Sequence, residues 1–159
     1  MNTVVELPDG PLELNDARWP QFLDVSGSAA PLPRLCYAAA HVVMDADYGG
    51  INHSNDHPGS AAEIADHLDW DATMAIRNRI GTTGMGIAEA MDTAQRFALG
   101  WDAARQLIER TGKLELPGGF CAGASTDHLT RSETTTEIID GVIEQIGVIR
   151  AAGGVAVIL

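Results

Sequence analysis

The sequence predicts a parallel α/β fold, in which short apolar strands alternate with amphipathic helices. The first strand is expected in the continuous apolar run over 35–43, although its alanines leave a helix open there. The clearest helix is expected over 134–151, where isoleucine and valine recur at helical spacing. Further strands are expected at 86–91, 120–124 and 155–159. Alternation of this kind gives a parallel sheet with right-handed crossovers.

The N-terminal segment, residues 1–33, is expected to precede the sheet as a separate part. Two short extended pieces at 4–7 and 12–14 flank Asp9 and Gly10, which indicates a hairpin. Proline and small residues break the pattern after Asn15, so we interpret that stretch as a surface leader. The α/β domain then covers residues 34–159.

Between the expected strands, the connections differ in length. Residues 45–69 are rich in Asp, Asn, His, Gly and Ser, which predicts a long loop that is either a functional lid or an insertion. Asp69 or Asp71 is expected to cap a helix that runs to about Ile80, and a second helix is expected over 101–110.

Charge and composition exclude several classes of partner. The net charge is −12, and Lys113 is the single lysine, so the surface repels phosphate backbones and anionic lipid. We therefore expect no nucleic-acid or membrane role, and a soluble, cytoplasmic protein without a segment of about 20 apolar residues. Cys36 and Cys121 stand far apart in apolar stretches and are interpreted as buried free thiols.

Polar residues follow three successive expected strands, at the end where parallel α/β folds bind ligands. The candidate catalytic residues are His41, Glu89, Asp92, Asp127 and His128. Imidazole beside carboxylates suits general acid–base chemistry or a divalent metal. A single residue of this kind is more often a cap or a loop hydrogen bonder. Three successive strand ends favour a shared site. We expect no cofactor, and the residue types leave a divalent metal open although no tight ligand spacing occurs.

Arg96 is the candidate for binding a substrate carboxylate or phosphate, because it closely follows the second strand. An intrahelical pair with Asp92, one turn away, is an equally good interpretation. Two other patterns are interpreted as decoys. His53 and His57 stand in a segment with Pro58 that predicts a solvated loop, and Gly81-Thr82-Thr83-Gly84 precedes the second strand.

The sequence resembles a bacterial family of dihydrodipicolinate-synthase-like proteins of largely uncharacterised function. The blocks that carry the resemblance are Tyr37-Ala38-Ala39-Ala40-His41-Val42-Val43, Leu68-Asp69-Trp70-Asp71-Ala72-Thr73, Ala88-Glu89-Ala90-Met91-Asp92-Thr93-Ala94-Gln95-Arg96, Cys121-Ala122-Gly123-Ala124-Ser125-Thr126-Asp127-His128-Leu129 and Ala151-Ala152-Gly153-Gly154. The resemblance implies a (β/α)8 barrel, of which this chain matches the N-terminal half: about four parallel strands with three helices. It also implies that the chain is truncated after the fourth strand.

The resemblance to dihydrodipicolinate synthase itself is weaker. Those enzymes carry a G-T-T-G-E loop after the second strand, whereas here the glycine–threonine motif comes before it and Met85 replaces the acid. The Schiff-base lysine and the tyrosine of those aldolases correspond to positions beyond Leu159, and Lys113 is expected at the opposite end of the barrel.

Three functions stay open on the sequence. The first is part of a lyase or aldolase that acts on a small oxygenated carbonyl compound, a keto acid or a sugar derivative. The second is a metal-assisted lyase or isomerase of sugar-like substrates. The third is a non-catalytic fragment or subunit that needs a partner. In each case we expect the isolated chain to be inactive as a lyase and to associate with itself or with a missing C-terminal half.

Overall fold

The computed structural model describes residues 2–7, 10–15, 34–50, 59–91 and 93–159, which fall into two compact units, 1–32 and 33–159. In the first unit, strands β1 (Asn2–Leu7) and β2 (Gly10–Asn15) pair antiparallel, with Leu7 opposite Gly10. The two strands expected around Asp9 therefore form. The expected leader over 16–33 lies outside the described residues.

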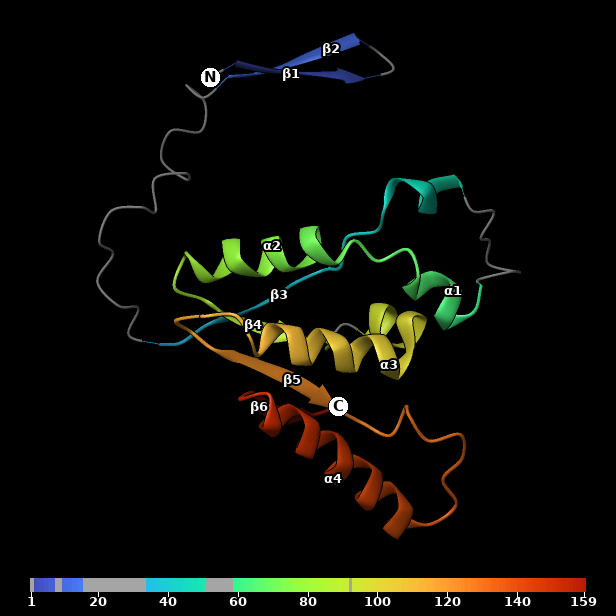
Figure 1. The fold of residues 1–159 in the computed structure, drawn as a ribbon. Coiled ribbons are helices and arrows are strands. Elements are labelled where there is room, and N and C mark those ends of the chain that lie inside the picture. The colour runs from blue at the N-terminus through green and yellow to red at the C-terminus, as the bar shows by residue number, and fades with distance from the viewer. Residues whose placement is uncertain (1, 8–9, 16–33, 51–58, 92) are drawn as a thin grey trace. The chain divides into compact units, whose positions relative to one another are not determined.

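The second unit is built on a parallel sheet of four strands (Figure 1). The strands are β3 (Tyr37–Ala39), β4 (Gly86–Glu89), β5 (Phe120–Ala124) and β6 (Val155–Ile158). Their order in the sheet is β3-β4-β5-β6, the same as along the chain. All three pairings are parallel, as the alternation of strands and helices predicted.

The described residues of this unit form four α-helices beside the sheet. They are α1 (Ala61–Ala65), α2 (Trp70–Gly81), α3 (Thr93–Thr111) and α4 (Thr135–Ala151), and a 3₁₀ helix, η2, covers Ala46–Gly50. Asp69 caps α2 by accepting a hydrogen bond from the backbone N–H of Ala72. Helix α3 begins before the expected residue 101, and Gly100, with φ 76° and ψ 169°, breaks it into two pieces.

Helix α1 corrects the expectation of a continuous loop over 45–69. Ser60 accepts a hydrogen bond from the N–H of Glu63, and the Glu63 carboxylate accepts one from the N–H of Ser60. This reciprocal capping box satisfies two N–H groups that a helix start otherwise leaves unpaired. The buried side chain of Ile64 then packs against α3 through Leu99 and Ala103.

The core lies between one face of the sheet and the helices. Ile87 of β4 and Phe120, Ala122 and Ala124 of β5 alternate with residues of the opposite face, and they cluster with Ile108 of α3 and Ile149 of α4. Ile80 of α2 packs against the same cluster. Helices α2, α3 and α4 thus cover the same face of the sheet (Figure 1).

On the opposite face the two outer strands, β3 and β6, are exposed, whereas β5 is buried on both faces. Tyr37 of β3 is 40% exposed and Val155 of β6 is 59% exposed. Cys36, which precedes β3, is also exposed, so the expectation of a buried thiol fails there and holds for Cys121. The reason is that the expected strand pairs with β4 over Tyr37–Ala39 alone.

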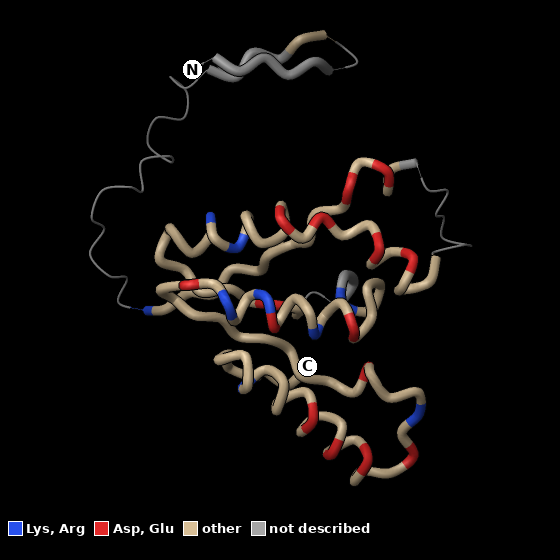
Figure 2. Tube along the Cα trace, viewed as in Figure 1, with Lys and Arg blue, Asp and Glu red and all other residues tan. Residues whose placement is uncertain are grey.

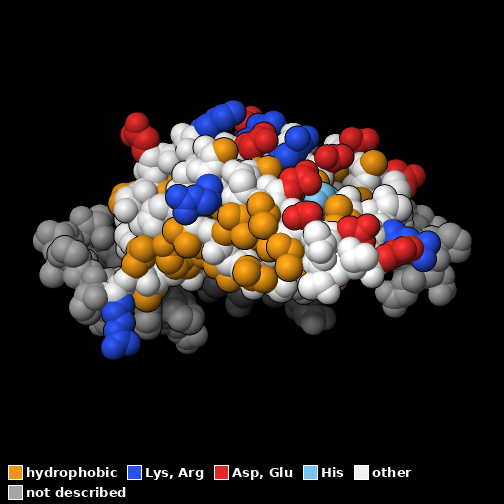
Figure 3. All heavy atoms as spheres, turned by 90° about the horizontal axis from the view of Figure 1, so that it is seen from below, with side chains coloured by type: hydrophobic (Ala, Val, Ile, Leu, Met, Phe, Trp, Pro, Cys, Tyr) orange, Lys and Arg blue, Asp and Glu red, His pale blue; other side chains and the backbone are white. Residues whose placement is uncertain are grey.

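Charged and apolar side chains divide the surface. Acidic residues line the first part of α4 (Figure 2), whereas hydrophobic side chains gather where α4 and β6 meet the solvent (Figure 3). The exposed hydrophobic residues of these two elements and the following position are Ile138, Ile139, Ile143, Val155, Ile158 and Leu159. We call this set the α4–β6 patch. Within the described residues, no helix is both long and apolar enough to cross a membrane.

Candidate functional site

The carboxyl ends of β3, β4 and β5 lie at one end of the sheet, because the three strands are parallel neighbours. His41 follows β3, Glu89 is the last residue of β4, and Asp127 follows β5. Asp92, another candidate, lies outside the described residues. The described candidates do not form a single cluster, because Glu89 and Asp127 belong to two different networks of buried hydrogen bonds.

The first network surrounds Glu89. Its carboxylate accepts two hydrogen bonds from Arg77 of α2, at 2.6 Å from Nε to Oε2 and 2.7 Å from Nη2 to Oε1. The hydroxyl of Thr111 donates to Oε2 at 2.6 Å, and the N–H of Ala90 donates to Oε1 at 3.0 Å. The side chains of Arg77 and Glu89 are 0% and 1% exposed. Glu89 is therefore the partner of a buried cation rather than an accessible acid or base.

Arg77 also fixes the chain that leaves β3. Its Nη1 donates to the carbonyl oxygens of His41, at 3.1 Å, and of Thr73, at 2.9 Å, and its Nη2 donates to that of Ala40 at 3.4 Å. These three bonds and the two to Glu89 use all five N–H groups of the guanidinium. Arg77 has no donor left for a ligand.

Thr73 holds the same segment one turn earlier on α2. Its Oγ1 accepts a hydrogen bond from the N–H of Val43 at 2.9 Å and donates to the carbonyl of Val43 at 3.4 Å. Residues 40–43 are thus attached to α2 by side chains instead of to β4 by a strand ladder. This is why the expected strand over 35–43 is shorter in the sheet.

The second network is centred on Arg96. Its Nε and Nη2 each donate to the Asp127 carboxylate at 2.9 Å, and Nη1 donates to the carbonyls of Ala90 at 3.1 Å and Gly123 at 2.6 Å. Nη2 also donates to Gln145 Oε1 at 2.5 Å. All five N–H groups are used, and the side chain of Arg96 is buried. Arg96 therefore has no free N–H group for the substrate anion that the sequence led us to expect, and its acidic partner among the described residues is Asp127; the alternative partner, Asp92, lies outside them.

Asp127 is held as a carboxylate by this network. Burial alone raises the pKa of Asp127, but hydrogen bonds from Arg96 and Gln145, together with the charge of Arg96, outweigh burial and lower it below its ordinary value. The acid is therefore a counter-ion for Arg96 and is poorly suited to donate a proton at neutral pH.

His128 is reached through Gln145, a residue of α4 that the sequence did not single out. Gln145 Oε1 accepts from Arg96 and from the N–H of Ser125, so its Nε2 is the donor, to Asp127 at 2.9 Å and to His128 Nδ1 at 2.8 Å. An accepting Nδ1 leaves the proton of the neutral ring on Nε2, which lies 3.3 Å from Glu144. Trp101 covers the ring at 5.8 Å between centroids. A single glutamine in an isoleucine-rich helix was the signal available in the sequence.

Ala90 connects the two networks. Its N–H donates to Glu89 and its carbonyl accepts from Arg96. Its φ of 48° is the one positive value among the described residues other than glycine. A left-handed alanine is strained, and such strain is often found at functional sites. Ala90 turns the chain away from the end of β4.

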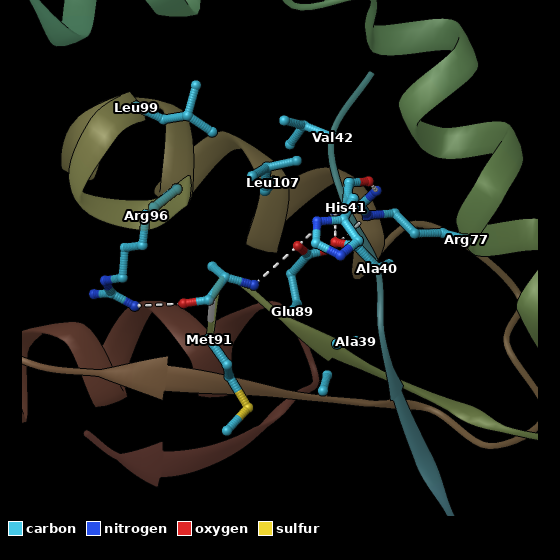
Figure 4. A pocket seen from close by; sticks show the side chains of 13 residues that line it. Ala39, Ala40, His41, Val42, Arg77, Glu89, Met91, Arg96, Leu99 and Leu107 are labelled. Atoms are coloured by element: carbon cyan, nitrogen blue, oxygen red, sulfur yellow. Dashed lines mark hydrogen bonds and ion pairs between the residues drawn. The ribbon is translucent and has the colours of Figure 1, made fainter. Parts of the chain in front are cut away.

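A small cavity lies between the diverging ends of β3 and β4 (Figure 4). Its walls are residues 39–42 and 88–91, and Leu99, Ala104 and Leu107 of α3 close it on the side of the helices. We call it the β3–β4 slot. Its volume is about 20 Å³, enough for about one water molecule. His41 lies on its wall and is exposed to solvent.

The glycine–threonine motif is not part of this end of the sheet. Gly81-Thr82-Thr83-Gly84 forms the end of α2 and the turn before β4, so it lies at the amino end of that strand. His53 and His57 lie outside the described residues. In the described part of the chain, no three His, Cys, Asp or Glu side chains are grouped closely enough to hold a metal ion.

Comparison with known proteins identifies the family of this chain, and the description of that family gives no activity. A family model described as "Protein of unknown function (DUF993)" matches residues 6–159, which is nearly the whole chain. A search of curated proteins found no match.

Proposed function

We propose that this chain, which belongs to the DUF993 family, forms successive strand–helix units of a (β/α)8 barrel and contributes to the site of a dihydrodipicolinate-synthase-like lyase or aldolase. The substrate is a small oxygenated carbonyl compound, a keto acid or a sugar derivative. The proposal rests on the resemblance of five sequence blocks, on the arrangement of the sheet and on the position of His41.

The arrangement of the sheet supports the barrel. The four strands keep their chain order, and the helices between them pack on one face. A doubly wound sheet reverses its strand order at a switch point and carries helices on both faces, whereas a barrel does neither. In a barrel the opposite face, with Ala88, Cys121 and Gly123, forms the interior.

The exposed imidazole of His41 at the carboxyl end of the sheet carries the proposed chemistry. Ligands of parallel α/β proteins bind at this end, and imidazole exchanges protons near neutral pH. Glu89 and Asp127 are each paired with an arginine, so neither competes for that role. His41 removes a proton from, or returns one to, the carbon next to the substrate carbonyl, which is the proton transfer that carbon–carbon cleavage of such compounds requires.

Deuterium exchange tests this role without knowledge of the full substrate. The protein is incubated with small keto acids and hydroxy ketones in D₂O, and loss of the proton beside the carbonyl is followed by NMR. We expect His41→Ala to slow the exchange that the protein catalyses by about 100-fold or more. Cys36→Ala changes an exposed residue at the other end of β3 from His41, and it should leave the rate of exchange unaltered. Absence of catalysed exchange, or equal exchange by His41→Ala, would refute the assignment.

Trapping with borohydride separates this proposal from an imine mechanism at the lysine of this chain. Lys113 is exposed in the turn between α3 and β5, at the opposite end of the sheet from His41. We expect borohydride with a keto acid to leave Lys113 unmodified in the mass spectrum. A covalent adduct on Lys113 would move the site to the amino end of the strands.

The structure offers less support for the metal-assisted alternative. Glu89 and Asp127 are saturated by guanidinium groups and lie in separate networks, and His128 is hydrogen bonded to Gln145 and Glu144. The remaining candidate of that proposal, His41, cannot by itself complete a set of ligands.

A further inference from the structure

The β3–β4 slot lies where the ends of β3 and β4 stop pairing and separate. The last paired residues of these strands are Ala39 and Ala88, and beyond them the two chains diverge. On one side, Arg77 and Thr73 attach residues 40–43 to α2. On the other side, Arg96 donates a hydrogen bond to the carbonyl oxygen of Ala90. Two buried arginines therefore keep the slot open from opposite sides, as Figure 4 shows.

The slot contains no uncommitted guanidinium. The five N–H groups of Arg77 and the five of Arg96 all donate to protein acceptors. Glu89, the buried acid on the wall, accepts bonds from Arg77, Thr111 and Ala90. An anionic group placed here has no counter-ion, and a cationic group has no free carboxylate.

Apart from His41, the rest of the lining is apolar. It consists of Ala39, Ala40, Val42, Ala88, Ala90, Met91, Leu99, Ala104 and Leu107. An apolar cavity of this size accommodates a methyl-sized group without loss of hydrogen bonds, whereas a water molecule needs two to four polar partners.

We propose that the β3–β4 slot binds an uncharged methyl end of the carbonyl substrate and places its carbonyl oxygen toward His41. This inference rests on the proposed function, since it takes His41 as the acid–base residue of the same site. It narrows the substrate class to carbonyl compounds whose end in the slot carries no charge, so that any carboxylate of a keto acid must point away from the slot.

Acetone and oxalate, whose ends are uncharged methyl groups in the first and carboxylates in the second, test the inference. Each is titrated into the protein labelled at the methyl groups of alanine, leucine and valine. We expect acetone to shift the resonances of Ala88, Val42 and Leu107 in a saturable way. Oxalate should bind at least about tenfold more weakly, because either of its ends would bring an unpaired carboxylate into the slot, where the carboxylate loses its hydration.

Variants that fill the slot identify where the probe binds. Ala104→Leu places a larger side chain in it, and Ala88→Val does so from the sheet if Ala104→Leu fails to fold. Both should abolish the shifts caused by acetone. Ala98→Leu, at an exposed position of α3, should preserve them.

The possible outcomes are distinct from those of the exchange assay. Oxalate binding as tightly as acetone, or no saturable shift by either probe in folded protein, overturns the inference about the slot. Either result leaves the role of His41 to be judged by deuterium exchange. Conversely, acetone binding that Ala88→Val blocks would support the inference about the slot even if His41→Ala had no effect on deuterium exchange.

Discussion

Removing the carboxylate of Glu89 should destabilise the protein far more than removing an exposed acid. Glu89→Leu leaves Arg77 charged at 0% exposure with two of its N–H groups unpaired, and leaves the hydroxyl of Thr111 without its acceptor. Breaking a buried ion pair in this way costs about 3–5 kcal/mol in the free energy of unfolding. That is a large part of the roughly 5–15 kcal/mol that stabilises a typical domain.

A double-mutant cycle separates the pair from the general effect of substitution. In Arg77→Met with Glu89→Leu both charges are gone, and apolar side chains of similar length fill the space. The double variant should be more stable than Glu89→Leu alone, with a coupling energy of about 2–3 kcal/mol. The residual loss reflects the three carbonyls that Arg77 no longer binds.

Urea unfolding followed by circular dichroism measures all of these variants. The control is Asp102→Asn, which removes a pair with Arg105 that is 3.7 Å long and has side chains 91% and 48% exposed. Solvent screens such a pair, so the midpoint should hardly move. If Glu89→Leu unfolds at the same urea concentration as Asp102→Asn, or if the two single losses simply add, the buried pair does not have the structural role assigned to it.

Three further predictions address other features. The pKa of Asp127 is lower in the folded protein than in the unfolded chain, so the carboxylate stabilises the fold above about pH 4, and this contribution is lost as the pH falls through the folded pKa. The difference in free energy of unfolding between wild type and Asp127→Asn, measured with urea, should therefore shrink over that range. A difference that stays constant with pH would contradict the prediction. In thermal unfolding, Ala90→Gly should stabilise the protein by up to about 1 kcal/mol, because relief of the left-handed alanine exceeds the entropy cost of glycine. Ala88→Gly, the control, should lower the free energy of unfolding by about 0.5–1 kcal/mol. The α4–β6 patch should cause self-association, detected by light scattering, and Ile143→Glu at a position 58% exposed should reduce it; a monomeric wild type would show that the patch is no contact surface.

The regular elements could be predicted because their signals are local. The strand at 120–124 and the helix around Ile149 are fixed by apolar runs and by helical spacing. Helix α1 is the exception: the polar composition of the surrounding segment predicts a loop, whereas the capping box of Ser60 and Glu63 starts a helix there. The wide apolar arc of α4 also hid which side is buried. Gly141, Gln145 and Ile149 are buried, whereas the neighbouring isoleucines at 139 and 143 are exposed.

The sequence predicts at which end of the sheet the candidate residues lie, but not which side chains they contact. Strand order brings His41, Glu89 and Asp127 to one end of the sheet, and this follows from alternation alone. Which of them faces solvent depends on partners in other elements: Arg77 is 12 residues from Glu89, and Arg96 is 31 from Asp127. No spacing rule in the sequence relates such pairs. They follow from how the helices pack on the sheet.

The hydrogen bonds of Arg96 connect segments far apart in the chain, and this affects how the protein unfolds locally. Its bonds join the end of β4, the end of β5 and α4, and the bond from Arg96 to Gln145 spans 49 residues of chain. A segment held in this way cannot detach alone without leaving buried donors unpaired. The second unit is thus built to lose β4, β5 and α4 together, as one cooperative unit of hydrogen exchange. We expect fraying in segments that the two arginines do not contact, such as the exposed edge of β6.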